Sequence, residues 1–186
     1  YFSKRQFFES LQAFERALEI DSDDLILKCN YANALHLVKK PEKALEYIET
    51  FLSVPNAPAD AFFIKANILS ELNDYRQAIE NYEISLKLRP NNEECFANLC
   101  YLLERTNKLE RLRQTLDKAK YQFNIVPDRI KYFEALTFYR SESFDECLEI
   151  ISSIDDTKVL GDAKLSFLQL KAKVLEKLGR FNSAFD

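Results

Sequence analysis

The sequence predicts an all-α fold in which pairs of helices recur along the chain and stack on one another. Three observations predict it. Gly and Pro are scarce, with two and five among 186 residues, whereas a many-stranded β fold needs turn residues at short intervals. Small and apolar residues recur at steps of 34 residues or slightly more. Within each recurrence, apolar residues lie three or four apart, which places them on one stripe of a helix.

The recurrence is clearest in two series of mostly small residues. One series contains Ser10, Ala44, Ala78, Leu112, Cys147 and Ala184, at steps of 34, 34, 34, 35 and 37 residues. The other contains Ala32, Ala66, Cys100, Ala135 and Ala172, at steps of 34, 34, 35 and 37 residues. Both series lengthen at the same places. Whole units therefore recur, with short insertions between the later ones.

The unit at 59–92 predicts its elements most clearly. We expect a first helix at 60–72, a turn at the Asn73-Asp74 pair and a second helix at 75–88. Asn and Asp favour the turn because their side chains bond to nearby backbone groups. Pro90 follows the second helix and ends it, because Pro cannot continue a helix.

The same unit carries a pattern that resembles the tetratricopeptide repeat. The matching residues are Phe62, Lys65, Ala66, Leu69, Asn73, Asp74, Tyr75, Ala78, Tyr82, Ser85 and Pro90. The resemblance covers essentially the whole chain, with departures at Lys65, Leu112, Cys147 and Pro41. It implies a right-handed superhelical solenoid of antiparallel helix pairs. Ala66 and Ala78 are then expected where the paired helices cross closely, since bulkier side chains would hold the backbones apart.

We expect a single solenoid over 1–186, with about five to six repeats of which both terminal ones are incomplete. The predicted division is a partial repeat at 1–24, repeats at 25–58, 59–92, 93–127 and 128–157, a connection at 158–164 and a partial repeat at 165–186. Solenoid ends are normally polar, but these ends carry Phe2, Phe7, Phe8, Phe181 and Phe185. We therefore expect further protein, or a partner, at both ends, and the uncapped ends also allow self-association.

Composition argues against several classes of function. The net charge is −4 and the basic residues form no run, which argues against nucleic-acid binding. No apolar run approaches the roughly 18 residues of a membrane span. The four cysteines form no C-x-x-C pair and His36 is the single histidine, so we expect no metal site and no cofactor. Reduced, buried cysteines favour a cytoplasmic location.

An enzymatic centre within the chain is not expected. The sequence lacks the glycine-rich phosphate and dinucleotide loops and the H-E-x-x-H metalloprotease pattern. A Ser–His–Asp set would have to use His36, which lies on a predicted helix with no nucleophile elbow near it.

The family resemblance implies a concave groove lined by the first helices, which binds a peptide or a segment of a partner protein. Seven residues at groove-facing positions are the candidate contacts: Asn30, Asn33, Asn67, Asn98, Tyr101, Arg129 and Tyr132. An Asn amide offers two donors and an acceptor to a peptide backbone, and Tyr offers a large, stiff surface with a polar tip. The same residue types also fit ordinary exposed helix surface or packing between repeats.

A narrower use of the groove is a carboxylate clamp, which binds chaperone C-termini in some members of the family. Asn67, Asn98 and Arg129 resemble three of its members. Phe63 and Phe133 stand where two basic members would be, so a carboxylate would be held poorly.

An alternative function is substrate presentation within a larger enzyme. Residues 178–186 resemble the final repeat that precedes the catalytic domain in bacterial tetratricopeptide–sulfotransferase fusions. This chain would then present the substrate to a catalytic domain that lies outside it. Sequence beyond Asp186 distinguishes the two functions, because a phosphate-binding loop after a strand supports the fusion and further 34-residue units support a scaffold.

Overall fold

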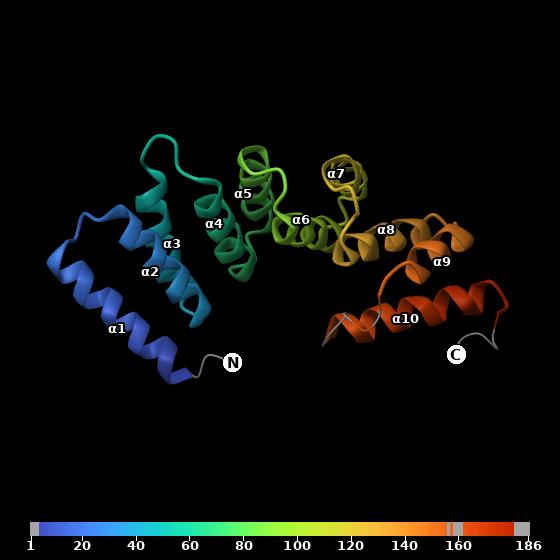
Figure 1. Ribbon diagram of the computed structural model, residues 1–186, viewed down its shortest axis with the longest axis horizontal. Coiled ribbons are helices and arrows are strands. Elements are labelled where there is room, and N and C mark those ends of the chain that lie inside the picture. Colours follow the sequence, from blue (N-terminus) through green and yellow to red (C-terminus); the bar gives the residue numbers. More distant parts are fainter. Residues whose placement is uncertain (1–3, 156, 158–161, 181–186) are drawn as a thin grey trace. The chain divides into compact units, whose positions relative to one another are not determined.

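A computed structural model describes residues 4–155, 157 and 162–180. These residues form ten helices and no strand (Figure 1). The helices are α1 (Lys4–Ile20), α2 (Leu25–Leu37), α3 (Pro41–Leu52), α4 (Ala59–Glu71), α5 (Tyr75–Leu88), α6 (Glu93–Arg105), α7 (Leu109–Gln122), α8 (Asp128–Arg140), α9 (Phe144–Ser152) and α10 (Asp162–Lys177). The predicted all-α class is confirmed. Within this described part of the chain, no helix is long and apolar enough to cross a membrane.

The chain divides into two compact units, residues 1–95 and 96–186, with the boundary inside α6. In the first unit α2 packs on α1 and α3, and α4 packs on α3 and α5. In the second unit α8 packs on α7 and α9, and α10 packs on α8 and α9. From α1 to α5 and from α7 to α10, helices that follow one another in sequence therefore pack together, as expected for helical hairpins joined by short turns.

A residue in the left-handed backbone conformation follows α2, α4, α6, α8 and α10. These five residues are Lys39, Asn73, Asn107, Glu142 and Gly179, with φ angles between 54° and 68°. Their spacing of 34, 34, 35 and 37 residues equals the lengthening recurrence of the sequence. The recurrence of small residues is therefore matched by a recurrence of one backbone geometry.

Each left-handed residue belongs to the same hydrogen-bonded turn. The amide that follows it donates to the carbonyl oxygen five residues earlier, at 2.8–3.0 Å. The pairs are Lys40 to Leu35, Asp74 to Leu69, Lys108 to Leu103, Ser143 to Phe138 and Arg180 to Leu175. This Schellman arrangement satisfies carbonyl groups that a helix end would otherwise leave unpaired. It therefore ends each of these helices at the same point of the recurring pattern.

The hairpin of α4 and α5 follows the predicted helices at 60–72 and 75–88 to within one residue. Asp74 caps α5 by accepting a hydrogen bond from the Gln77 amide at 3.1 Å, which satisfies one of the amides left unpaired at a helix start. Ala66 and Ala78 are completely buried. Their burial is consistent with the close crossing of the two helices expected from the sequence.

Polar contacts fasten the open end of the same hairpin. The buried hydroxyl of Ser85, near the end of α5, donates to the Ala59 carbonyl oxygen at 2.9 Å. Arg89 donates to both carboxylate oxygens of Asp60 at 2.6 and 2.7 Å. Bidentate pairing of this kind fixes orientation as well as distance. The start of α4 is thereby held to the end of α5.

The structure differs from one sequence expectation. α10 begins at Asp162, so part of the connection expected at 158–164 is helical. Ala163 and Lys164 are good helix formers and extend the helix toward its start. The division of the chain into repeats stays a prediction.

The expectation of apolar ends is met in part by the described residues. Phe8 is 60% exposed on α1. Phe2, the side chain of Phe7, Phe181 and Phe185 lie outside the described residues.

The left-handed turns make a prediction about stability. Glu142 has a φ of 62° and Gly179 a φ of 68°, a region where a Cβ is strained and Gly is not. We expect Glu142→Gly to stabilise the fold and Gly179→Ala to destabilise it, each by about 1 kcal/mol. Urea denaturation followed by circular dichroism measures both changes.

The alanine at 179 would have no steric conflict, because an added Cβ meets no atom within 4 Å. Any loss in Gly179→Ala is therefore a backbone effect. Stability changes of the same sign in the two variants would contradict the assignment of these turns.

Candidate partner-binding site

The first unit places two candidate residues together on α2. Asn30 and Asn33 are both exposed, and their spacing of three residues puts them on one face of the helix. Ile26 and Leu37 lie on the same face and are 69% and 53% exposed. This face of α2 is therefore a stripe with two amides at its centre and an apolar side chain at each end.

Asn67 on α4 has a structural contact that the sequence did not indicate. Its side-chain oxygen accepts a hydrogen bond from the Tyr82 hydroxyl at 2.6 Å. Tyr82 lies on α5 and is 2% exposed, so its hydroxyl needs such a partner. The Phe63 ring lies 6.0 Å from the Tyr82 ring. Asn67 is half-buried and contributes to the packing of α4 on α5.

The second unit presents Tyr101 and Asn98 on α6. Tyr101 is 47% exposed, and its hydroxyl accepts a hydrogen bond from Arg105 Nη1 at 2.9 Å. Arg105 lies four residues further along the same helix, where side chains are neighbours. Asn98 is half-buried. An exposed aromatic ring is thus held in position by an arginine.

Arg129 and Tyr132 lie on α8 in different environments. Arg129 is exposed, and Tyr132 is half-buried with its ring 5.6 Å from the Phe133 ring. Burial raises the pKa of Tyr132, and the charge of Glu104 adds to the increase, while a hydrogen bond with Ser166 opposes it. Tyr132 therefore stays protonated at neutral pH. Its side chain is more buried in the second unit than that of Arg129.

A second feature, which sequence reasoning missed, joins successive hairpins at the helix ends. Glu71 at the end of α4 lies 3.1 Å from His36 Nε2 and 2.8 Å from Lys39 Nζ. The Glu71 side chain is 24% exposed. Its Oε2 atom is buried, and no described group donates a well-aligned hydrogen bond to it. One carboxylate thus holds the end of α2 to the end of α4 chiefly by charge.

The second unit has the same arrangement with the opposite charge. Arg140 at the end of α8 donates to Glu104 and also to Asn107 Oδ1, the latter at 3.2 Å. Glu104 and Asn107 occupy, relative to the left-handed residue, the positions of the two donors in the first unit. In the second unit the central residue is the cation Arg140, which donates to two acceptors. In the first unit the central residue is the anion Glu71, which lies beside His36 and Lys39. We call these two groups of three residues the inter-hairpin clasps.

The cysteines are placed as packing residues. Cys95, Cys100 and Cys147 are buried, and Cys29 is partly buried. Burial raises the pKa of Cys95 and Cys100 to about 12 and that of Cys147 to about 11. These thiols are therefore protonated and unreactive at neutral pH. In the described ranges, no three His, Cys, Asp or Glu side chains gather in a way that could hold a metal ion.

These hairpins define a class of protein, the helical-hairpin repeat proteins. Residues 59–92 match the family model of the tetratricopeptide repeat. Over 115 residues, the chain is 29% identical to a tetratricopeptide repeat-containing protein of Methanocaldococcus jannaschii. That alignment covers 62% of this chain and 20% of the relative. The chain thus spans about one fifth of the length of this curated relative.

Solved structures show the same fold. PilF of Pseudomonas aeruginosa superposes with a TM-score of 0.77 at 18% identity, over 99% of this chain and 83% of PilF. YrrB, described as a tetratricopeptide-repeat protein with an unusual peptide-binding site, superposes with a TM-score of 0.69 at 21% identity, over 94% and 93% of the two chains. The predicted resemblance is confirmed: residues 59–92 match the tetratricopeptide repeat, and the described helices share the fold of these solved structures.

The clasp of the first unit makes stability depend on pH. Burial lowers the pKa of His36, the positive charge of Lys39 adds to the lowering, and Glu71 opposes it. Because the pKa in the folded chain lies below the usual 6.5, folding favours the neutral ring. The corresponding stability is present above the pKa of the unfolded chain and is lost as pH falls through the lower folded pKa.

We therefore expect wild-type protein to be less stable at about pH 5 than at about pH 7, and His36→Gln to lose less stability over the same interval. The comparison is clean because the chain has one histidine and all carboxylates are common to both proteins. Urea denaturation at the two pH values measures the difference. Equal losses in the two proteins would show that His36 does not titrate against folding.

Proposed function

We propose that this chain is a protein-interaction scaffold that binds a peptide or an extended segment of a partner protein on the exposed faces of its first helices. The candidate contacts are Asn30, Asn33, Asn67, Asn98, Tyr101, Arg129 and Tyr132. What supports the proposal most is the exposure of Tyr101 in a fixed position.

Tyr101 carries the argument because its exposed ring is held in one position. It is 47% exposed, and its hydroxyl is held by Arg105 at 2.9 Å. A tyrosine has two side-chain torsions, so it loses little conformational entropy on binding and offers a large contact area. With its hydroxyl already bonded, the exposed ring of Tyr101 is suited to an apolar side chain of the partner.

The exposed amides of the first unit suit a peptide backbone. Asn30 and Asn33 are exposed on α2, and each amide can both donate and accept hydrogen bonds. A peptide backbone presents both kinds of group along its length. Recognition of this kind tolerates different partner sequences, which fits a scaffold.

The alternative, substrate presentation in a larger enzyme, finds no specific support. It rests on residues 178–186, and 181–186 lie outside the described residues. The activity of any parent protein, the absence of a catalytic centre and the cytoplasmic location all stay predictions. The peptide-binding site in the description of YrrB belongs to that protein, and it makes peptide binding a reasonable first test here.

The test is selection of binders from a random peptide display library, followed by affinity measurement. We expect Asn67→Ala combined with Asn98→Ala to weaken the selected peptides by about tenfold or more, since lost polar contacts typically cost about 1 kcal/mol each. Circular dichroism shows whether helicity is kept. Unchanged affinity in the double variant, or a selection that yields no binder, would contradict the proposal.

Two control variants separate binding from packing. Tyr82→Phe removes the hydrogen bond to Asn67 but leaves the Asn67 amide in place, so it reports the structural share of any loss. Asn91→Ala changes an exposed asparagine in the loop before α6 and should leave affinity unchanged.

A further inference from the structure

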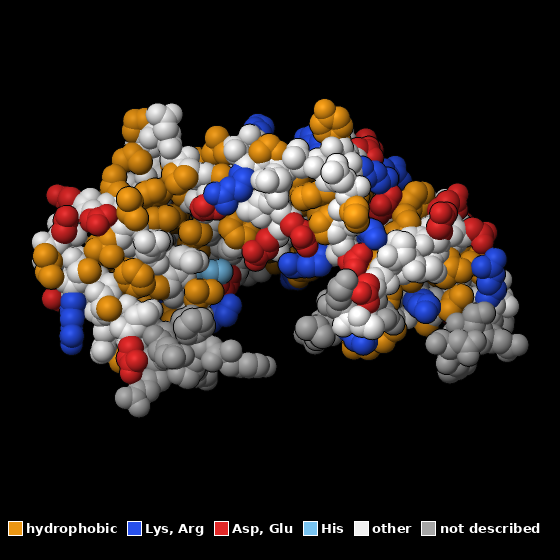
Figure 2. Space-filling model, viewed as in Figure 1, with side chains coloured by type: hydrophobic (Ala, Val, Ile, Leu, Met, Phe, Trp, Pro, Cys, Tyr) orange, Lys and Arg blue, Asp and Glu red, His pale blue; other side chains and the backbone are white. Residues whose placement is uncertain are grey.

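The exposed stripe of α2 is partly apolar and faces solvent. Ile26 and Leu37 are 69% and 53% exposed, with Asn30 and Asn33 between them on the same face. The opposite face of α2 packs inside the first unit through residues such as Leu35, which is 1% exposed. Figure 2 shows hydrophobic side chains gathered over α1, α2 and α3 on the visible face. This stripe is therefore surface that the first unit itself does not cover.

The stripe has an internal symmetry. Reversing this segment about the point midway between residues 31 and 32 brings four pairs of exposed residues onto side chains of the same kind or of opposite charge, whereas Asp21 falls on Glu42, which has the same charge. The exchanged pairs are Ile26 with Leu37, Asn30 with Asn33, Asp24 with Lys39 and Asp23 with Lys40. A two-fold axis through that point would perform this exchange, because an isologous contact pairs residue i with j′ and j with i′.

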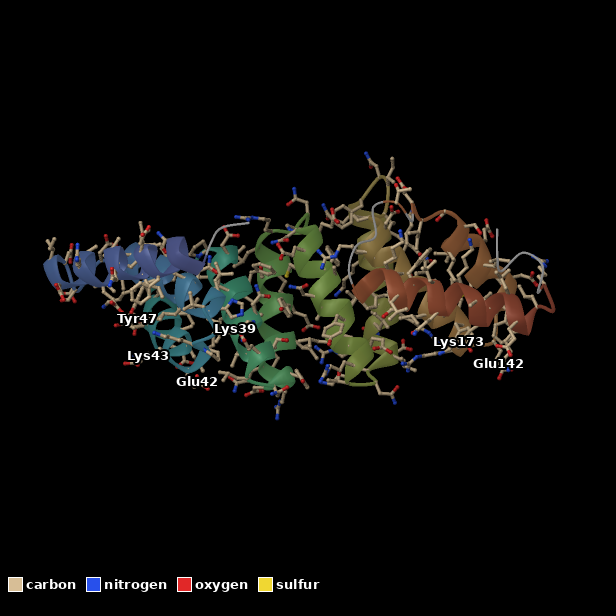
Figure 3. The ribbon with its side chains drawn as sticks, turned by 90° about the horizontal axis from the view of Figure 1, so that it is seen from below. Lys39, Glu42, Lys43, Tyr47, Glu142 and Lys173 are labelled. Atoms are coloured by element: carbon tan, nitrogen blue, oxygen red, sulfur yellow. The ribbon has the colours of Figure 1, made fainter. Side chains whose placement is uncertain are left out.

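The charges at the two ends of α2 are opposite in sign. Asp21, Asp23 and Asp24 precede the helix and are exposed. Three lysines follow it, Lys39, Lys40 and Lys43, and all are exposed. Figure 3 labels Lys39 and Lys43 here, together with Glu42, whose single negative charge the lysines outnumber. The stripe is thus bounded by carboxylates at one end and by ammonium groups at the other.

Three of these charged residues also have side-chain contacts within the first unit. Asp21 accepts hydrogen bonds from the Asp23 and Asp24 amides at 3.0 and 3.2 Å, and Asp24 accepts one from the Leu27 amide at 3.0 Å. Lys39 pairs with Glu71 while its side chain remains 75% exposed. Asp23 and Lys40 are therefore the better residues for a test, since changing them leaves the helix cap and the inter-hairpin clasp intact.

We propose that α2 is a self-association surface, on which α2 of a second copy of this chain packs antiparallel about a two-fold axis. Ile26 then contacts Leu37 of the second copy, the asparagines pair at the centre, and the acidic end of each helix meets the basic end of the other. The antiparallel arrangement also brings opposite ends of the two helix dipoles together.

A second copy fits this stripe better than a partner with charge of one sign. An acidic partner would be attracted by the lysines and repelled by Asp21, Asp23 and Asp24, and a basic partner would meet the reverse. A second copy presents both signs at the required spacing. One helix crossing covers less than the roughly 1,200 Å² of a standard interface, so the dimer is expected to be weak and to depend on protein concentration.

This inference does not depend on the proposed peptide binding. Asn67 and Asn98, which test the peptide proposal, lie on α4 and α6, away from the stripe on α2. A negative result in the peptide-binding experiment therefore does not count against self-association, and a negative result for self-association does not count against peptide binding. If both hold, dimerisation covers Asn30 and Asn33 and competes with a partner there.

The first measurement is sedimentation of the 186-residue chain over a concentration series from about 1 to about 500 µM, a range that brackets weak dimers. We expect a monomer–dimer equilibrium. Leu37→Glu should weaken the dimer about tenfold or more, because it places a charge in the apolar contact. Leu88→Glu is the matched control, since Leu88 is 55% exposed on α5 outside the stripe, and it should leave the equilibrium unchanged.

Charge reversal tests the antiparallel geometry directly. Asp23→Lys alone and Lys40→Asp alone each create two like-charge contacts in a symmetric dimer, and each should weaken it about tenfold. An equimolar mixture of the two variants should form a heterodimer with near wild-type affinity, because every contact then joins opposite charges. Circular dichroism verifies that both variants fold.

Three results would overturn the proposal. They are a wild-type chain that stays monomeric over the whole series, a dimer that Leu37→Glu leaves intact, and a mixture of the charge variants that associates no better than either alone.

Discussion

Everything in this fold depends on one backbone turn, in which a residue with positive φ ends a helix. The turn occurs after α2, α4, α6, α8 and α10. In each case the amide that follows the positive-φ residue donates a hydrogen bond to the carbonyl oxygen five residues earlier. A helix that ended one residue later would rotate its successor by about 100°, since a helix has 3.6 residues per turn. The apolar stripe of the next helix would then miss its partner. Fixing the end of each first helix is what allows hairpins such as α4–α5 to bury Ala66 and Ala78 completely.

Similar hairpins also need contacts that differ from one pair to the next, because identical contacts would let any hairpin stack on any other. The inter-hairpin clasps provide such contacts within each unit. Glu71 lies among donors in the first unit, and Arg140 lies among acceptors at the corresponding positions in the second. Exchanging either central residue for the other would bring like charges together, which disfavours the wrong arrangement. The same ends of the helices thus carry a common backbone geometry and distinct charges.

The sequence predicted the fold well because its information is local. Asn73 and Asp74 predicted the turn and the cap, and the helices at 60–72 and 75–88 were correct to within one residue. Contacts between helices were missed: neither the Asn67–Tyr82 hydrogen bond nor the Glu71 ion pairs leave a signal in one helix. Lys39 and Glu142 were missed as turn residues because Lys and Glu rarely adopt positive φ. The candidate site could be placed on helices, but side-chain exposure, which separates Tyr101 from Tyr132, required coordinates.

Amide hydrogen exchange followed by NMR tests the central role of the turn most directly. The amides of Lys40, Asp74, Lys108, Ser143 and Arg180 each donate the hydrogen bond that closes a turn, and a bonded amide exchanges only when its bond opens. We predict that these amides of the 186-residue chain are protected, although all five follow the last turn of a helix, where ends normally fray. Exchange at these amides as fast as in an unstructured peptide would contradict the account.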